Sequence, residues 1–270
     1  SAMCLIAFAL DAHPRYRLLL AANRDEFHQR PALAAHWWND APDVYGGRDL
    51  DAGGTWLAID RHARLAALTN FRERPYRGAG ERSRGELGAS FLRSTTPAHL
   101  HAEGLLPDVG RYGGFNLLLF DLFREQHSGV YLTNRDESRP LQSLTPGLHT
   151  LSNHLLDSRW PKSLRLRQAL ESALNEADPF EPLFDALSDR TPVSAAEFVT
   201  ELDSDDPDVL TRTPFIFDAR YGTRASTVVA VTHDGTLRFA ERSWRWASEA
   251  PVFSGERRLE FNALEKLPSC

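Results

Sequence analysis

The chain has 270 residues, of which 42% are hydrophobic, and this is enough apolar material to bury one large core. Lys and Arg total 31 against 37 Asp and Glu, so the net charge is −6 and no basic block is present that would follow the phosphates of a nucleic acid. These numbers argue against a disordered chain and against a nucleic-acid-binding protein.

The longest apolar runs, such as 116–120, are far shorter than the roughly 20 residues that span a bilayer, and no charged-then-apolar leader precedes a cleavage site. We expect no membrane span and a cytoplasmic location. Residues 1–3 resemble a cloning remnant that ends in the initiator methionine, so we expect one domain over 4–270. The only cysteines, Cys4 and Cys270, make neither a disulfide framework nor a zinc site, and we expect no bound metal.

Alternating apolar residues, with β-branched and aromatic enrichment, predict eight strands along the chain. They are expected at 5–10, 16–22, 55–60, 65–70, 114–121, 129–133, 227–232 and 237–242. His13-Pro14 is the expected turn between the first two strands, and Asp234-Gly235 forms a hairpin turn between the last two because both positions tolerate positive φ.

Three helices are predicted in the middle of the chain. The first is 84–93, where Ser83 and Glu86 suggest a capping box. The second is 161–176, whose apolar face consists of Leu166, Leu170, Ala173 and Leu174. A third begins at Ser194 and ends near residue 202, followed by an exposed acidic loop over 203–209. Strand-rich ends and a helix-rich middle predict an α+β fold with helices packed on antiparallel sheets.

The tetrapeptide Asn-Arg-Asp-Glu occurs at 23–26 and again at 134–137, and turn chemistry explains either copy adequately. The first copy has a further feature, because Cys4 opens one predicted strand while Arg24 and Asp25 close its hairpin partner. A guanidinium there would lower the thiol pKa from about 8.5 and a carboxylate could orient an amine, as an activated nucleophile requires. The alternative is that Cys4 is a small core residue.

Other candidate motifs are weak. The segment 46–56, GGRDLDAGGTW, lacks the Gly-Lys-Ser/Thr of a phosphate loop and the distal Glu of a calcium loop, so we interpret it as a turn-rich connection before a strand. His99 and His101 have no third ligand at a suitable spacing and are expected to be surface histidines.

Seven pieces of the sequence, in order, resemble the Asn-Arg-Asp-Glu (NRDE) family, also called the transport-and-Golgi-organisation family. They are MCLIAF from Met3, AANRDEF from Ala21, GGRD and GGTWLAI from Gly46, ALTNFRE from Ala67, YGGFNLLL from Tyr112, PGLHTLSNHLLDSRWPK from Pro146 and YGTRASTVV from Tyr221. The family is similar to the N-terminal-nucleophile (Ntn) hydrolases, among which choloylglycine-type amidases begin Met-Cys. The resemblance implies a four-layer αββα sandwich of two stacked antiparallel sheets.

The same resemblance implies a set of site residues. Cys4 would be the nucleophile and its α-amino group the base, with Arg24 and Asp25 tuning the sulfur and orienting the amine. Asn70 and Asn153 resemble the asparagines that donate to an oxyanion, and Arg224 resembles a distal active-site arginine. The alternatives are turn capping for the two asparagines and a surface ion pair for the arginine.

The implied function is an N-terminal cysteine hydrolase or acyltransferase that acts on a C–N amide or acyl-thioester bond of a small-molecule substrate, without a cofactor. The alternative is a non-catalytic carrier of haem or of lipid or acyl-CoA, the ligands with which the family is associated. In that case the conceivable haem contacts are His28, His36, His154, Trp37 and Trp38. A third interpretation is a degenerate hydrolase fold with structural duties only. The sequence indicates neither the substrate nor the oligomeric state.

Overall fold

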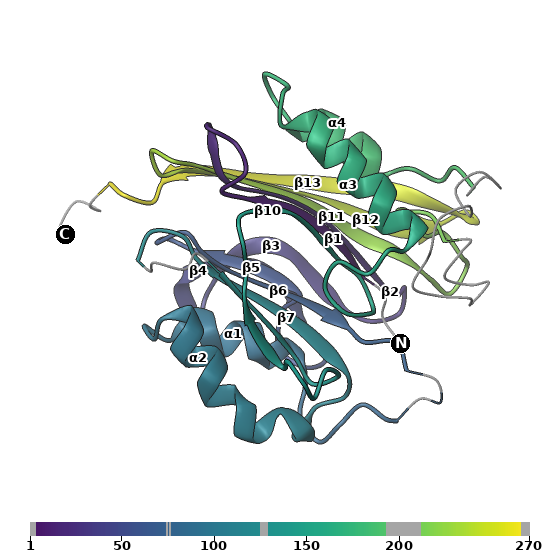
Figure 1. The fold of residues 1–270 in the computed structure, drawn as a ribbon. Helices are drawn as coiled ribbons and strands as arrows, with labels where there is room; N and C mark the ends of the chain where they lie inside the picture. Colours follow the sequence, from purple (N-terminus) through teal and green to yellow (C-terminus); the bar gives the residue numbers. More distant parts are fainter. Residues whose placement is uncertain (1–3, 74, 76, 125–128, 193–211, 266–270) are drawn as a thin grey trace.

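The computed structural model describes residues 4–73, 75, 77–124, 129–192 and 212–265, which form two stacked β-sheets (Figure 1). Sheet A has six strands in the order β10-β1-β2-β11-β12-β13, and sheet B has seven in the order β3-β4-β5-β6-β7-β8-β9. All pairings between these strands are antiparallel.

The strands of sheet A are β1 (Cys4–Leu10), β2 (Tyr16–Phe27), β10 (Gly147–Leu151), β11 (Tyr221–Thr232), β12 (Thr236–Ala247) and β13 (Ala250–Asn262). Those of sheet B are β3 (Ala32–Trp38), β4 (Ala41–Asp49), β5 (Leu57–Asp60), β6 (Arg64–Asn70), β7 (Phe115–Asp121), β8 (Gly129–Thr133) and β9 (Leu141–Ser143).

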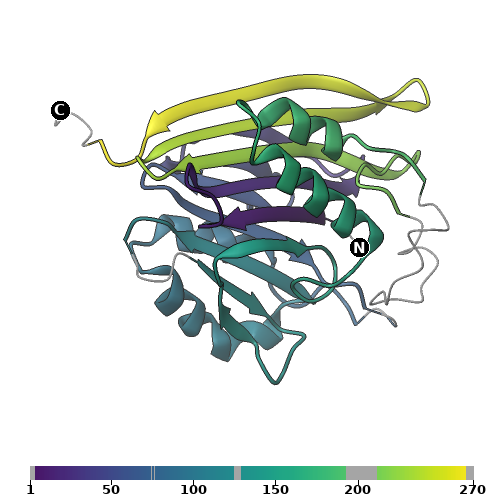
Figure 2. The same cartoon turned by 45° about the horizontal axis from the view of Figure 1, so that its top comes forward.

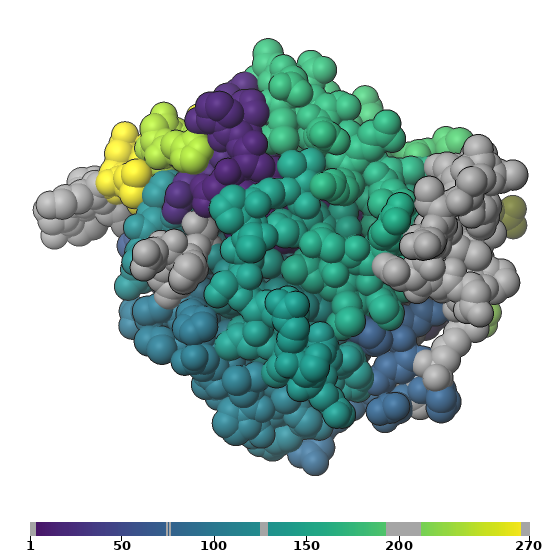
Figure 3. All heavy atoms as spheres, in the orientation of Figure 1, coloured from purple at the N-terminus to yellow at the C-terminus, as the bar shows by residue number. Residues whose placement is uncertain are grey.

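Helices cover the outer face of each sheet (Figures 1 and 2). Helices α3 (Pro161–Ala173) and α4 (Phe180–Leu187) pack on β1 and β11 of sheet A. Helices α1 (Gly85–Arg93) and α2 (Ala98–Leu105), followed by a 3-10 turn (Leu106–Arg111), pack on β6 and β8 of sheet B. The predicted α+β architecture, a four-layer αββα sandwich, is therefore confirmed. On the face in Figure 3, purple atoms of the first hairpin reach the surface beside the green atoms of the α3–α4 region.

Alternation along β1 decides which layer each side chain joins, since successive residues of a strand point to opposite faces. Ile6 and Phe8 enter the apolar core between the sheets, whereas Leu5 and Ala7 enter the core beneath α3 and α4. Both faces of β1 are therefore buried. This is why its sequence is a continuous apolar run.

A buried ion-pair cluster ties sheet B to the end of α1. Arg64 is 2% exposed and lies 3.5 Å from the carboxylates of both Asp60 and Asp121. Its guanidinium also donates to the main-chain oxygens of Ser94 at 2.5 Å and Thr96 at 2.7 Å. Contacts from three separate segments hold the guanidinium in place, while its Nε has no hydrogen-bond partner among the described residues.

The eight predicted strands are all present, although β2, β11 and β12 extend beyond the expected ends. Strands β3, β4, β9, β10 and β13 and helices α2 and α4 were not predicted. The expected capping box is wrong, because the N-cap residue of α1 is Arg84, whose side chain makes no hydrogen bond that caps the helix, and Glu86 instead accepts from Tyr112. The predicted helix from Ser194 and the loop 203–209 lie outside the described residues.

Across the ranges that the structure describes, no helix has both the length and the apolar character required to cross a membrane.

Candidate active site

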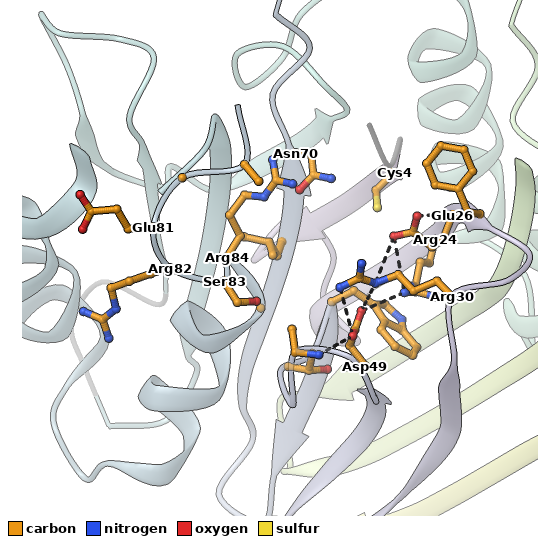
Figure 4. A pocket seen from close by; sticks show the side chains of 18 residues that line it. Cys4, Arg24, Glu26, Arg30, Asp49, Asn70, Glu81, Arg82, Ser83 and Arg84 are labelled. Atoms are coloured by element: carbon orange, nitrogen blue, oxygen red, sulfur yellow. Dashed lines mark hydrogen bonds and ion pairs between the residues drawn. The ribbon is translucent and has the colours of Figure 1, made fainter. Parts of the chain in front are cut away.

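Cys4 is the first residue of β1 and lies directly opposite Arg24 of β2 in the antiparallel ladder. Both side chains point into the layer between the sheets, at the end where the apolar core gives way to a cavity of about 460 Å³ (Figure 4). Its charged and polar walls come from both sheets and include Cys4, Arg24, Glu26, Arg30, Asp49, Trp56, Asn70 and Ser83. The hairpin thus brings the predicted nucleophile and arginine together in one cavity.

The Cys4 thiol is held in its neutral form. Burial and, to a smaller extent, the negative charge of Asp25 raise the pKa of Cys4 to about 12, while Arg24 acts in the opposite direction. The side chain is only 7% exposed. Because the thiolate rather than the thiol is nucleophilic, this sulfur needs a base that removes its proton when substrate arrives.

Arg24 is fixed by a stack and by two carboxylates. Its guanidinium lies 4.2 Å from the centroid of the Trp56 ring of sheet B, and 3.4 and 3.7 Å from carboxylate oxygens of Asp49 and Glu26. The indole in turn lies against Gly47, where an added Cβ would be 2.1 Å from the ring. Close packing of Trp56 therefore explains Gly47, whereas Gly46 makes room for Ala58, whose Cβ would lie 2.5 Å from an added Cβ.

Asp49 was not predicted as a site residue, and the interpretation of 46–56 as only a connection is wrong, because Gly46 to Asp49 complete β4. The Asp49 carboxylate accepts hydrogen bonds from Arg30 Nε at 2.5 Å (Figure 4) and from the main-chain N–H of Ala52 at 3.0 Å. Burial alone would raise the pKa of Asp49, but the hydrogen bonds from Arg30 and Ala52 and the charges of Arg30 and Arg24 together outweigh it, and the pKa is lowered. Asp49 is thus an ionised counter-charge for two arginines.

The two predicted oxyanion asparagines have different positions. Asn70, at the end of β6, lines the cavity and its side chain faces Cys4 across it (Figure 4). Asn153 is 1% exposed and does not line the cavity. Its side-chain amide donates to the main-chain oxygen of Asn70 at 2.7 Å, so Asn153 supports Asn70 from behind.

Asp25 points to the other face of sheet A, as alternation requires once Arg24 faces the cavity. Its Oδ1 accepts from Thr223 Oγ1 at 2.7 Å, and its Oδ2 is buried without a hydrogen-bond partner among the described residues. Burial raises the pKa of Asp25 to about 6, opposed most strongly by the charge of Lys162. Lys162, in the first turn of α3, is 1% exposed, and burial lowers its pKa. The sequence analysis missed this lysine.

Arg224 does not line the cavity that contains Cys4. It lines a second cavity of about 260 Å³, which shares Arg24 and Trp56 with the first. Its Nη1 donates to the main-chain oxygens of Phe27 at 2.9 Å and Arg30 at 3.0 Å. This arginine is tied to the main chain after β2 rather than being a surface ion pair.

The second Asn-Arg-Asp-Glu copy is confirmed as turn chemistry. Asn134 accepts from the N–H of Phe115 and donates to three main-chain oxygens, while Asp136 accepts from the N–H groups of Ser138 and Arg139. Asp136 is used within its own turn and Asn134 fixes the segment that leads into β7, and both belong to the sheet B side of the molecule, whereas Cys4 lies in sheet A.

The histidines considered for haem lie elsewhere. His28 contacts the oxygen of Asp218, His36 that of Ala34, and His154 the hydroxyl of Ser158, and none of the three lines either cavity. His99 is exposed, whereas His101 is half-buried and contacts Ser90. No cluster of three or more His, Cys, Asp or Glu side chains suited to a metal occurs within the described ranges.

The family model described as Transport and Golgi organisation 2 matches residues 3–245. The chain belongs to this family. The match contains each of the residues placed above, from Cys4 and Arg24 to Asn153 and Arg224. The family resemblance drawn from the seven sequence pieces is therefore confirmed.

Individual relatives are similar over most of their length. The chain is 36% identical to the Transport and Golgi organization protein 2 homolog of Bos taurus and 35% identical to that of Homo sapiens, covering 89% of this chain and 93% of each relative. Among solved structures, a Caenorhabditis elegans ortholog of N-acylethanolamine-hydrolyzing acid amidase is similar with a TM-score of 0.48 and 11% identity, covering 83% of this chain and 91% of that one.

Proposed function

We propose that this family member is an N-terminal cysteine hydrolase or acyltransferase, acting on a C–N amide or acyl-thioester bond of a small-molecule substrate. One observation carries the proposal: the Cys4 thiol and Arg24 face a cavity whose opposite wall presents the Asn70 side chain. A nucleophile, a fixed positive charge and an amide donor are the groups that acyl transfer requires.

The proposed reaction begins with a free α-amine on Cys4, which takes the thiol proton as Sγ attacks the carbonyl carbon. The Asn70 amide donates to the oxygen that becomes negatively charged, and Arg24 favours the thiolate. Collapse of the intermediate breaks the C–N bond, and the leaving nitrogen receives the proton from the amine. Water or an acceptor nucleophile then releases the acyl group from the Cys4 thioester.

Asp25 is proposed to orient the amine rather than to act on the sulfur, since its carboxylate and the thiol lie on opposite faces of sheet A. Because β1 begins at Cys4, the α-amine lies at the very end of the strand, where groups on either face of sheet A can reach it. Lys162 supplies the charge that favours ionised Asp25. The proposal further takes residues 4–270 as one domain that works in the cytoplasm.

The test uses protein that begins at Cys4, in a Cys270→Ser background so that a single thiol remains. Matched amides and acyl thioesters are supplied, and intact mass spectrometry detects an acyl adduct that is lost on incubation with hydroxylamine. Cys4→Ser should abolish a thioester adduct, whereas Asn262→Ala, which removes a side-chain amide at the far end of sheet A, should retain it. Turnover that survives Cys4→Ala would contradict the proposal.

A further inference from the structure

The second cavity lies beside the first in the same inter-sheet layer. Its walls come from β3 of sheet B and from β11, β12 and β13 of sheet A. Both cavities are lined by Arg24 and Trp56, which stack on each other. This stacked pair is therefore the partition between the Cys4 cavity and the second cavity.

The lining of the second cavity carries an excess of positive charge. The residues that line it include four arginines and two glutamates, namely Arg24, Arg224, Arg245, Arg257, Glu241 and Glu256. Arg24 is already paired with Asp49, and Glu256 is already paired with Arg242 at 2.7 Å. Arg224, Arg245 and Arg257 make no ion pair with any residue that the structure describes, so the cavity has cations in need of a counter-charge.

Arg224 is the least exposed of these three cations. Burial lowers its pKa, and the neighbouring charge of Arg24 lowers it further. Two main-chain oxygens nevertheless hold its Nη1 in place. A guanidinium kept half-buried next to a second guanidinium is electrostatically unfavourable, and a bound anion would relieve this repulsion.

Glu241 adds an unmet hydrogen bond to the same wall. It is 1% exposed, its Oε1 accepts from the N–H of Ala35 at 2.8 Å, and its Oε2 is buried with no partner among the described residues. Burial raises the pKa of Glu241 to about 7, opposed by the Ala35 N–H and by the charges of Arg24 and Arg257. Burial, and after it the charge of Glu241, raises the pKa of Tyr45. In its protonated form, the carboxyl group can donate one hydrogen bond to an oxyanion.

We propose that the second cavity is a subsite for an oxyanion of the ligand, in which Arg224 and Arg257 supply positive charge and Glu241 donates a hydrogen bond. Carboxylate, phosphate and sulfate groups share this chemistry. The proposal rests on the proposed function only in placing the remainder of the ligand beside Cys4, past the Arg24–Trp56 pair. Anion binding itself does not require catalysis.

The first experiment titrates the protein with sodium sulfate and, separately, sodium acetate at constant ionic strength. Fluorescence is the readout because Trp56 and Trp244 both line the cavity. Saturable binding is expected to weaken about tenfold or more in Arg224→Met and in Arg257→Met. Arg238→Met is the control, because it removes one positive charge from another part of β12, where Arg238 pairs with Asp178. This variant should bind both anions as tightly as the wild type does. Tighter binding of sulfate would indicate a subsite for a tetrahedral group, and tighter binding of acetate would indicate one for a planar carboxylate.

The second experiment follows sulfate binding from pH 5 to 9, a range in which sulfate does not titrate. Affinity should fall as pH rises through about 7, because Glu241 loses the proton it donates and gains a charge that repels the anion. Glu241→Gln retains the donor without titrating, so its sulfate affinity should vary less with pH. An unchanged pH profile in Glu241→Gln would remove Glu241 from the subsite.

The third experiment compares adipamic acid with adipamide, which share a chain and one amide but differ in a terminal carboxylate. The acid should bind about tenfold more tightly than the diamide, and this preference should disappear in Arg257→Met. Measuring both ligands in Cys4→Ser separates the two proposals, because anion preference should persist there even if the protein is not a hydrolase. Sulfate binding that is unsaturable, or equally weakened by Arg238→Met, would overturn the subsite.

Discussion

The side-chain amide of Asn153 donates a 2.7 Å hydrogen bond to the main-chain oxygen of Asn70. This relationship makes Asn153 a positioning residue, since Asn70 alone of the two lines the cavity with Cys4. Asn153→Ala should slow Cys4 acylation by about tenfold, less than the 10²–10³ expected for Asn70→Ala, because only the donor's orientation is loosened.

The measurement is the rate of acyl-adduct formation on protein that begins at Cys4. Asn262→Ala is the matched control, because its amide also bridges to a main-chain oxygen, that of Asp234, at the far end of sheet A. It should leave the rate unchanged. If Asn153→Ala and Asn262→Ala behaved alike, the positioning role would be lost.

The residue that precedes Cys4 should control turnover. When residues 1–3 are present, the nitrogen of Cys4 is a peptide amide, which cannot accept the thiol proton as an amine with a pKa of about 7.7–8.0 can. A form that begins at Cys4 should react faster by a factor of about 10²–10⁴, the usual effect of a positioned general base. Equal rates for the two forms on one acyl donor would exclude the α-amine from the mechanism.

Burial of the thiol predicts a shifted alkylation profile. With residues 1–3 present and Cys270 replaced by serine, iodoacetamide should label folded Cys4 slowly at pH 8, with a rate still rising at pH 10, because the pKa of this thiol is about 12. The same chain in urea should label with a midpoint near the ordinary value of about 8.5. A plateau below pH 9 in the folded protein would contradict the neutral buried thiol.

Stability also follows from this shift. Because the folded state resists ionisation, only the unfolded chain loses the Cys4 proton as pH rises through about 8.5, and the thiol's contribution to folding stability decreases above that pH. Cys4→Ala should therefore reduce the loss of unfolding free energy between pH 8 and 10. Urea titrations at these two pH values measure the difference.

Arg61 lies in the turn of the β5–β6 hairpin and Arg64 is the first residue of β6, yet the two should have very different effects on stability. Arg64→Met leaves two buried carboxylates, Asp60 and Asp121, without their counter-ion and should cost about 3–5 kcal/mol of unfolding free energy. Arg61 pairs with Asp43 at the surface, with its side chain 32% exposed, and Arg61→Met should cost less than about 1 kcal/mol. Similar midpoints for the two variants in urea unfolding would show that the buried cluster is not stabilising.

Much of the Cys4 hairpin could be predicted from the sequence because its information is local. Two neighbouring apolar runs joined by a turn at His13-Pro14 are sufficient to predict a hairpin that places Cys4 opposite Arg24. The sequence pattern also found the apolar face of α3, whose four residues all enter the core beneath the helices.

The missed elements depend on tertiary packing. Strand β13 contains Gly255 and a run of charges, so it shows little alternation and is stabilised by pairing with β12 along its length. Asp49 and Lys162 have no distinguishing local pattern, and they become site candidates only once the sheets and α3 bring them to Arg24 and Asp25. The Asp25 side chain points away from the thiol because strand alternation places it on the face of sheet A opposite the cavity, and the position of the cavity is known only from the packed sheets.

The position of β13 at the edge of sheet A has a consequence for association between copies of the chain. Its outer N–H and C=O groups form a template to which another strand can add. If two copies paired antiparallel about Arg258, the two Arg258 side chains would face each other, and Glu256 of each copy would face Glu260 of the other. Like charges placed directly opposite one another destabilise a ladder, so the sequence of this edge discourages the sheets of two molecules from joining into one.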